Sequence, residues 1–80
     1  MVEFTLFKCK DKGGISIKPK NPVNLDLASL KSKFNVIMFT PITMVIDEDG
    51  EIIVHNYGEL LFKTLKDEAK ITEIARRIYG

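Results

Sequence analysis

The chain has 80 residues, of which 45% are hydrophobic and 29% are charged, and its formal net charge is +1. This length and composition predict a single domain over residues 1–80 and exclude a disordered chain. The longest apolar stretch, residues 36–46, is broken by Thr40, Pro41 and Thr43 and is too short to span a bilayer, so we expect no membrane partner.

The N-terminal residues are predicted to form a β-hairpin. Residues 2–10 (VEFTLFKCK) alternate loosely and are rich in aromatic and branched side chains, which is typical of a strand. Residues 15–20 (ISIKPK) alternate more cleanly, and we expect Pro19 to end this second strand or to mark a sheet edge. The DKGG sequence at 11–14 supplies the turn, because glycine reaches positive φ without steric cost.

A short helix is predicted next. Leu27, Leu30 and Phe34 fall at helical spacing and form one apolar stripe. Asn24 or Asp26 can accept hydrogen bonds from the free amides of the first turn, so either residue is a candidate cap.

The middle of the chain is predicted to be a run of strands. Residues 35–47 (NVIMFTPITMVID) are apolar on both faces, which is typical of a central strand covered on both sides. Pro41 cannot donate a ladder hydrogen bond, so this stretch is two strands or one strand with a bulge. Residues 51–57 and 59–65 are predicted to be further strands, divided at Gly58.

The C-terminal residues 66–80 predict a second helix, capped by Thr64 or Asp67. Four apolar side chains at helical spacing form its stripe: Ile71, Ile74, Ala75 and Ile78. Strands follow one another instead of alternating with helices. We therefore expect an α+β fold, with a mostly antiparallel sheet of about five strands and two helices packed on one face.

The segment VIDEDGEIIVH at residues 45–55 is the most site-like motif, because four carboxylates surround one glycine. A calcium loop with Gly50 at its sixth position would place Val45 and Asn56 at two principal ligand positions, so that loop is excluded. Asp-Gly between apolar runs favours a plain hairpin tip. The alternative is weak divalent-cation binding at the tip carboxylates, which are Asp47, Glu48, Asp49 and Glu51.

Candidate catalytic chemistry is sparse. Cys9 is the only cysteine, which excludes an internal disulfide and is typical of a reducing compartment, so we expect a cytoplasmic protein. His55 is the only histidine, and a packing role is favoured for it. Neither a redox cysteine pair nor a phosphate-binding glycine loop occurs. We expect no cofactor and no enzymatic activity.

Lysines form the other cluster, and they suggest a nucleic-acid partner. Phosphate contact needs a row of cations, ideally with exposed aromatic rings for base stacking. Phe4 and Phe7 lie nearby but are expected to face the core. A solvated lysine face that protects a sheet edge is therefore favoured, and phosphate contact is the alternative. The candidate contacts are Lys8, Lys10, Lys12, Lys18 and Lys20.

From Asn24 onwards, the layout resembles one lobe of the TATA-box-binding protein family. The local likeness lies in P-ITMVIDEDGEIIVHNYGE, a proline followed by an apolar strand, a tight glycine turn, a second apolar strand and a further glycine. In that family the concave sheet face binds the DNA minor groove through phenylalanine wedges. This chain differs by its single lobe, its leading hairpin and its acidic tip, and no wedge residue transfers to it.

Taken together, these patterns predict a small non-enzymatic binding module. Charge is unevenly spread, since residues 41–60 carry five carboxylates and no lysine or arginine. Such polarity favours an oriented protein partner or self-association over indiscriminate binding to a polyanion. A homodimer would also stabilise a chain this short. The two alternatives are the lysine-hairpin nucleic-acid interface and the cation-binding tip. Gln and Trp are absent, and the few thermolabile amides together with many Lys and Ile residues are typical of a heat-loving source.

Overall fold

A computed structural model describes residues 3–8, 14–21 and 23–79. Within these ranges the chain forms six strands and two helices. The strands make one antiparallel sheet, in the order β1-β2-β6-β5-β4-β3. In chain order the elements are β1 (Phe4–Lys8), β2 (Ile15–Pro19), α1 (Leu27–Leu30), β3 (Val36–Phe39), β4 (Thr43–Asp47), β5 (Glu51–His55), β6 (Leu60–Phe62) and α2 (Glu68–Tyr79).

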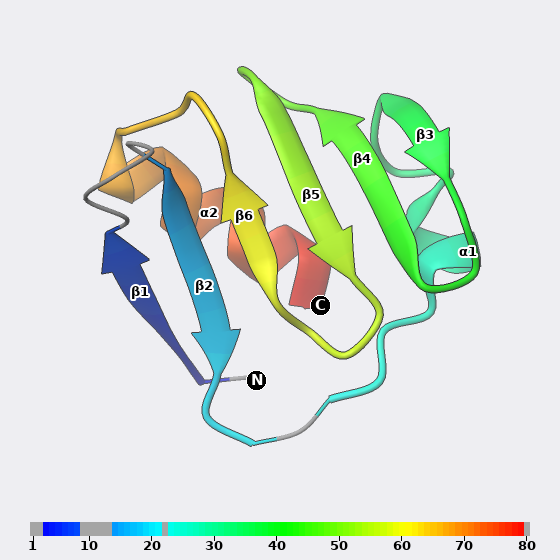
Figure 1. Cartoon of the computed structure of the whole chain (residues 1–80), viewed down its shortest axis with the longest axis horizontal. Coiled ribbons are helices and arrows are strands. Elements are labelled where there is room, and N and C mark those ends of the chain that lie inside the picture. The colour runs from blue at the N-terminus through cyan, green and yellow to red at the C-terminus, as the bar shows by residue number, and fades with distance from the viewer. Residues whose placement is uncertain (1–2, 9–13, 22, 80) are drawn as a thin grey trace.

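The fold class predicted from the sequence is confirmed as α+β, with six strands where about five were expected. Figure 1 shows the strands side by side in front, with both helices behind them. The sheet combines two local units. The β1–β2 hairpin supplies one edge, the β3–β4–β5–β6 meander supplies the other, and β2 pairs with β6 between them. The turn at 9–13 lies outside the described residues.

Tight turns follow where the sequence permits unusual backbone angles. Asp49 and Gly50 form the tip between β4 and β5, with φ values of 58° and 130°. Gly58 divides β5 from β6 with a φ of 103°. Glycine is favoured in this left-handed region because it lacks a Cβ atom. At Gly58, an added Cβ would also meet Val23 and Pro19.

Each helix begins at an aspartate whose carboxylate accepts hydrogen bonds from free backbone N–H groups of the first turn. Asp26 accepts from the hydroxyl of Ser29 and from its backbone N–H at the start of α1, and these two bonds, the hydroxyl bond first, lower the pKa of its carboxyl. Asp67 accepts from the N–H groups of Ala69 and Lys70 at the start of α2. Helix α1 ends after four residues, so Phe34 reaches the core from the segment that follows it.

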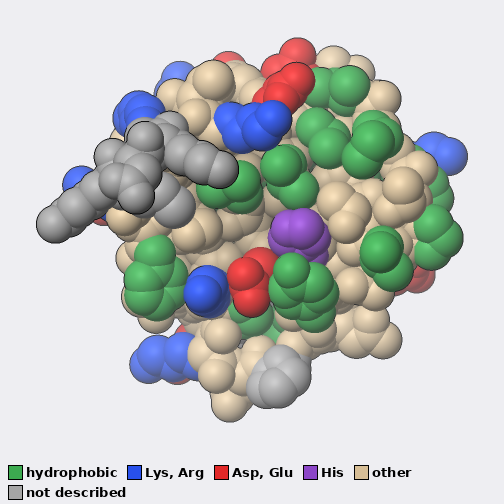
Figure 2. All heavy atoms as spheres, in the orientation of Figure 1, with side chains coloured by type: hydrophobic (Ala, Val, Ile, Leu, Met, Phe, Trp, Pro, Cys, Tyr) green, Lys and Arg blue, Asp and Glu red, His purple; other side chains and the backbone are tan. Residues whose placement is uncertain are grey.

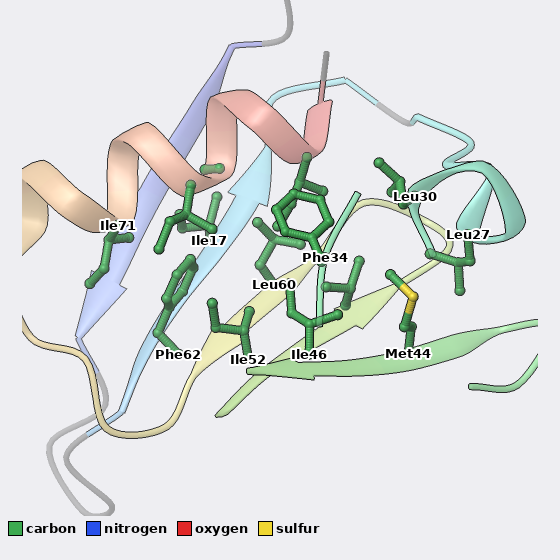
Figure 3. Packing of buried hydrophobic residues seen from close by; sticks show 14 of the residues in the cluster. Ile17, Leu27, Leu30, Phe34, Met44, Ile46, Ile52, Leu60, Phe62 and Ile71 are labelled. Carbon is green, nitrogen blue, oxygen red and sulfur yellow. The ribbon is translucent and has the colours of Figure 1, made fainter. Parts of the chain in front are cut away.

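One hydrophobic core lies between the sheet and the helices. Alternate residues of the inner strands point toward the helices, and the predicted stripe of α2 covers them (Figure 3). Eight of the largest side chains are fully buried, namely Ile17, Met44, Ile46, Ile52, Val54, Leu60, Phe62 and Ile71. Their burial stabilises the fold by about 0.8 kcal/mol per buried CH₂.

The expectation that residues 35–47 are covered on both sides is wrong. This segment forms β3 and β4, joined by a turn at 40–42, and β3 is an edge strand. Strand β4 buries Met44 and Ile46 against the helices, whereas Val45 between them is only half-buried on the opposite side. The helices cover one face of the sheet, so the apolar side chains of its other face lack a cover within the described residues.

Candidate interaction surface

The uncovered sheet face carries a row of mostly apolar side chains across all six strands. Directly paired residues of antiparallel strands point to the same face, so the strand register defines this row. From β1 to β3 it consists of Phe7, Ser16, Leu61, Ile53, Val45 and Met38. Its four central members are half-buried by their neighbours, whereas the two terminal members are each 47% exposed.

Exposed apolar side chains concentrate around the edge strand β3, on both sides of the sheet, because Met38 pairs with Val45 of the uncovered face whereas Phe39 pairs with the buried Met44. Of the six large hydrophobic residues that are exposed in the described chain, four lie on β3 or on the turn after it. Hydrophobic side chains gather in the same region of Figure 2. These residues form the β3 patch, namely Ile37, Met38, Phe39 and Ile42, with exposed fractions of 55%, 47%, 36% and 64%.

A β-bulge shapes the β3 patch. Val36 pairs with Ile46 and Met38 pairs with Val45, so Ile37 is the extra residue and leaves the ladder. The turn that follows is held by Thr40, whose hydroxyl accepts from the N–H of Thr43 at 2.9 Å and donates to its carbonyl oxygen at 2.8 Å. These bonds close the turn, and the backbone N–H of Asn56 donates to the carbonyl of Ile42. The side chain of Ile42 is 64% exposed.

Charged side chains border the patch. The Lys31 ammonium lies 4.8 Å from the centre of the Phe39 ring, a cation–π arrangement. At the other end of β3, the backbone N–H of Asp47 donates to the carbonyl of Asn35. Lys31 therefore lies at the Phe39 end of β3 on the helix side, whereas Asp47 lies at the Asn35 end on the uncovered side. The Arg77 guanidinium lies 5.0 Å from the centre of the Phe34 ring, so the Asn35 end carries a cation as well.

Two aromatic groups occupy the same uncovered face. The rings of His55 and Tyr57 stack with centroids 5.0 Å apart, and His55 Nδ1 lies 3.4 Å from the Thr43 hydroxyl. Far along the sheet, the Lys18 ammonium lies 5.5 Å from the centre of the Phe7 ring. The expectation that Phe7 faces the core is wrong, because the β1–β2 register pairs it with Ser16 on the uncovered side.

The three candidate nucleic-acid lysines that the structure describes do not form one row. Lys8 pairs with the buried Ile15 and bridges to Glu68 of α2 at 3.2 Å, on the helix side. Lys18 lies on the uncovered side, and Lys20 bridges to Glu3 at 3.4 Å. Lys10 and Lys12 lie outside the described residues, as does Cys9.

The acidic tip also divides between the two sides of the sheet. Glu51 bridges to Lys63 at 3.3 Å, Asp49 bridges to Lys70 of α2 at 3.8 Å, and Asp47 accepts from the N–H of Gly50. Among residues 3–8, 14–21 and 23–79, no three His, Cys, Asp or Glu side chains are grouped to hold a metal ion. The plain hairpin tip explains this geometry, and cation binding by Glu48 and its neighbours stays a prediction.

A hydrogen bond between α2 and a turn fixes the lower end of the sheet. The Tyr79 hydroxyl donates to the carbonyl of Gly58, and its ring packs on Phe4 with centroids 5.4 Å apart. Burial raises the pKa of Tyr79 to about 12, and the nearby Glu59 carboxylate adds to the rise. This contact couples the closing helix to the β5–β6 turn, which also carries Tyr57.

Sequence reasoning missed the β3 patch, although it identified residues 35–47 as apolar on both faces. A strand that is apolar on both faces has the same pattern whether its own chain or a partner covers the second face. The available signal was Pro41, which splits the segment and makes an edge position natural for the shorter half.

Comparisons with known proteins give no relative from which a role for this surface could be inferred. No protein-family model, curated protein or solved structure matches this chain. Within the described residues, no helix has the length and apolar character needed to cross a membrane.

Proposed function

We propose that this protein is a non-enzymatic module that binds another protein chain through the β3 patch. The single observation that carries the proposal is the gathering of four exposed hydrophobic side chains at one sheet edge. Scattered exposed apolar residues are ordinary, whereas a contiguous patch marks an interaction surface.

The composition of the patch favours a protein partner over a polyanion. Protein interfaces are enriched in aromatic residues and Met and depleted of charge at their centre. Phe39 and Met38 fit that description, with Lys31 and Asp47 placed at the rim. Rim charges orient an incoming partner and add little affinity of their own.

Affinity capture with three baits tests the proposal. Wild type, Met38→Lys and Phe7→Lys are immobilised and exposed to extract of the cells that make the protein. Met38 and Phe7 are both 47% exposed, so the two variants place the same charge at equally exposed positions on opposite edges. We expect a protein retained by wild type and Phe7→Lys but lost from Met38→Lys. Identical captured sets on all three baits would contradict the proposal.

A nucleic-acid interface is the second candidate, favoured by one specific observation. Phe7 and Tyr57 present exposed rings on the uncovered face, and Lys18 lies beside the first. Exposed rings on a sheet stack unpaired bases, and a neighbouring cation attracts the phosphate. The resemblance to a TATA-box-binding protein lobe points to the same face and stays a prediction.

Titration with short single-stranded and duplex DNA separates the two candidates. Binding through the rings predicts amide shifts centred on Phe7 and Tyr57 that weaken with salt, because phosphate contacts release counterions. A spectrum unchanged by either DNA at low salt would exclude this candidate.

A further inference from the structure

We infer that the partner chain bound at the β3 patch presents an acidic segment. Its carboxylates face the cations on the helix side of β3, and its apolar side chains face the uncovered side. The inference rests on the proposed function, because it names the chemistry of the partner at the same surface.

The two edge strands differ in whether the cations that flank them are paired. At the β1 edge, Lys8 bridges to Glu68 at 3.2 Å, and Lys20 bridges to Glu3 at 3.4 Å. The exposed cations that flank β3 form no ion pair with any residue that the structure describes. They are Lys31, Lys33 and Arg77. An incoming carboxylate therefore meets free cations at the β3 edge and neutralised ones at the β1 edge.

Two of these cations are held against aromatic rings, one at each end of β3. The Lys31 ammonium lies 4.8 Å from the centre of the Phe39 ring, and the Arg77 guanidinium lies 5.0 Å from the centre of the Phe34 ring. Phe39 pairs with the buried Met44, and Phe34 belongs to the core, so both cations lie on the helix side. Packing on the rings fixes the two positive charges beside apolar surface.

The carboxylates of the helix side are too few to cancel this charge. Asp49 bridges to Lys70 at 3.8 Å, and Asp26 is engaged as the cap of α1. Glu73 lies one turn before Arg77 on α2 and forms no ion pair within the described parts of the chain. The helix side of β3 is therefore the side that attracts an acidic group, and such complementarity orients a partner.

The uncovered side of β3 favours apolar groups. Met38 is 47% exposed there and pairs with Val45, while the carboxylate of Asp47 on the same side disfavours another acid. Successive side chains of an extended segment alternate between the two sides of a sheet. A segment of alternating acidic and apolar residues that lies along β3 meets both requirements. Because Ile37 interrupts the ladder, these side-chain contacts decide the choice of partner more than backbone pairing does.

A protein segment fits this surface better than a nucleic acid. Phosphates also bind cations, but bases need an open ring face for stacking. Lys31 lies over the Phe39 ring, and Phe34 is only 8% exposed. The other exposed side chains of the patch are aliphatic or thioether groups, which suit the apolar side chains of a protein.

Fluorescence anisotropy with three labelled peptides tests the inference. Each peptide has about ten residues, enough to span β3 at about 3.3 Å per residue, and alternates leucine with glutamate, glutamine or lysine. Wild type should bind the glutamate peptide at least about fivefold more tightly than the glutamine peptide, because each exposed ion pair strengthens binding by up to about fivefold. The lysine peptide should bind most weakly. Salt at about 1 M should abolish the preference for glutamate, since it screens charges beyond about 3 Å.

Charge reversal identifies the cations responsible. Lys31→Glu should weaken binding of the glutamate peptide by about fivefold or more, because one attraction becomes a repulsion. Lys33→Glu should act in the same direction. Lys66→Glu is the matched control, since it changes the net charge equally beside the start of α2, where Glu68 contacts the β1 edge. This control should match wild type, and circular dichroism verifies that each variant is folded.

The outcomes separate this inference from the proposed function. A glutamate peptide that binds no more tightly than the glutamine peptide, or equal losses in Lys31→Glu and Lys66→Glu, would overturn the acidic partner. Tighter binding of a labelled thymidine decanucleotide, lost in Lys31→Glu, would assign these cations to nucleic acid instead. In either case a protein captured through Met38 leaves the proposed function standing. Capture that does not depend on Met38 would remove the proposed function and this inference with it.

Discussion

Adjacent isoleucines in β5 provide a direct test of the one-sided sheet. Ile52 is 0% exposed and points to the helices, whereas Ile53 is half-buried on the uncovered face. Threonine retains the branched β-carbon, so Ile→Thr at either position leaves strand propensity nearly unchanged. The difference between the two variants therefore reports burial alone.

The expected costs differ severalfold. At Ile52 the change removes two buried carbons, about 1.6 kcal/mol at about 0.8 kcal/mol each, and buries a hydroxyl at about 1–3 kcal/mol, for a total of about 3–5 kcal/mol. At Ile53 the hydroxyl reaches water, so the cost stays below about 1 kcal/mol. A domain of 80 residues has only about 4–12 kcal/mol of stability in all, so the first variant is severely weakened.

Urea unfolding followed by circular dichroism measures both variants. Protein concentration should be low, so that self-association does not add to the apparent stability. Ile52→Thr should lower the midpoint strongly, and Ile53→Thr only slightly. Equal losses would show that both faces of β5 are buried, and the uncovered face would then be refuted.

Three further predictions concern the turns and caps. Because the pKa of Tyr79 is about 12 in the folded protein and 10.0 ordinarily, folded stability is full below pH 10 and declines as pH rises toward 12. Thermal melts should show this decline in wild type and a shallower one in Tyr79→Phe. Gly58→Ala should cost more than about 1 kcal/mol in urea unfolding, because its φ is 103° and the new methyl meets Val23; an unchanged midpoint would contradict the turn geometry. Asp26→Ala should lower the melting temperature and Asp26→Asn should largely preserve it, since the amide oxygen still accepts from Ser29; equal losses would exclude capping.

Local chemistry explains what the sequence predicted well. The α2 stripe follows from helical spacing alone, and all four of its members are buried. The β4–β5 tip follows from Asp49 and Gly50, whose positive φ values the Asp-Gly pair permits. Asp67 caps α2 because its carboxylate lies within reach of the following amides. Each of these features depends on residues only a few positions apart.

Non-local pairing explains what the sequence could not predict. The side of the sheet that Phe7 and Lys8 occupy depends on the β1–β2 register and on the pairing of β2 with β6 from the far end of the chain. No spacing along the sequence encodes that neighbour. The pattern of residues 35–47 likewise indicates that both faces of the segment are apolar. It does not indicate that the helices cover only one of these faces.

Photo-cross-linking tests the binding role of the β3 patch most directly. A photoreactive phenylalanine analogue replaces Phe39 in one variant and Phe7 in the other, both exposed rings at opposite edges of the sheet. Irradiation of cells that make the protein should yield a discrete cross-linked protein product at position 39, and little or none at position 7. No product at position 39, or equal products at both positions, would contradict the β3 patch as the binding surface.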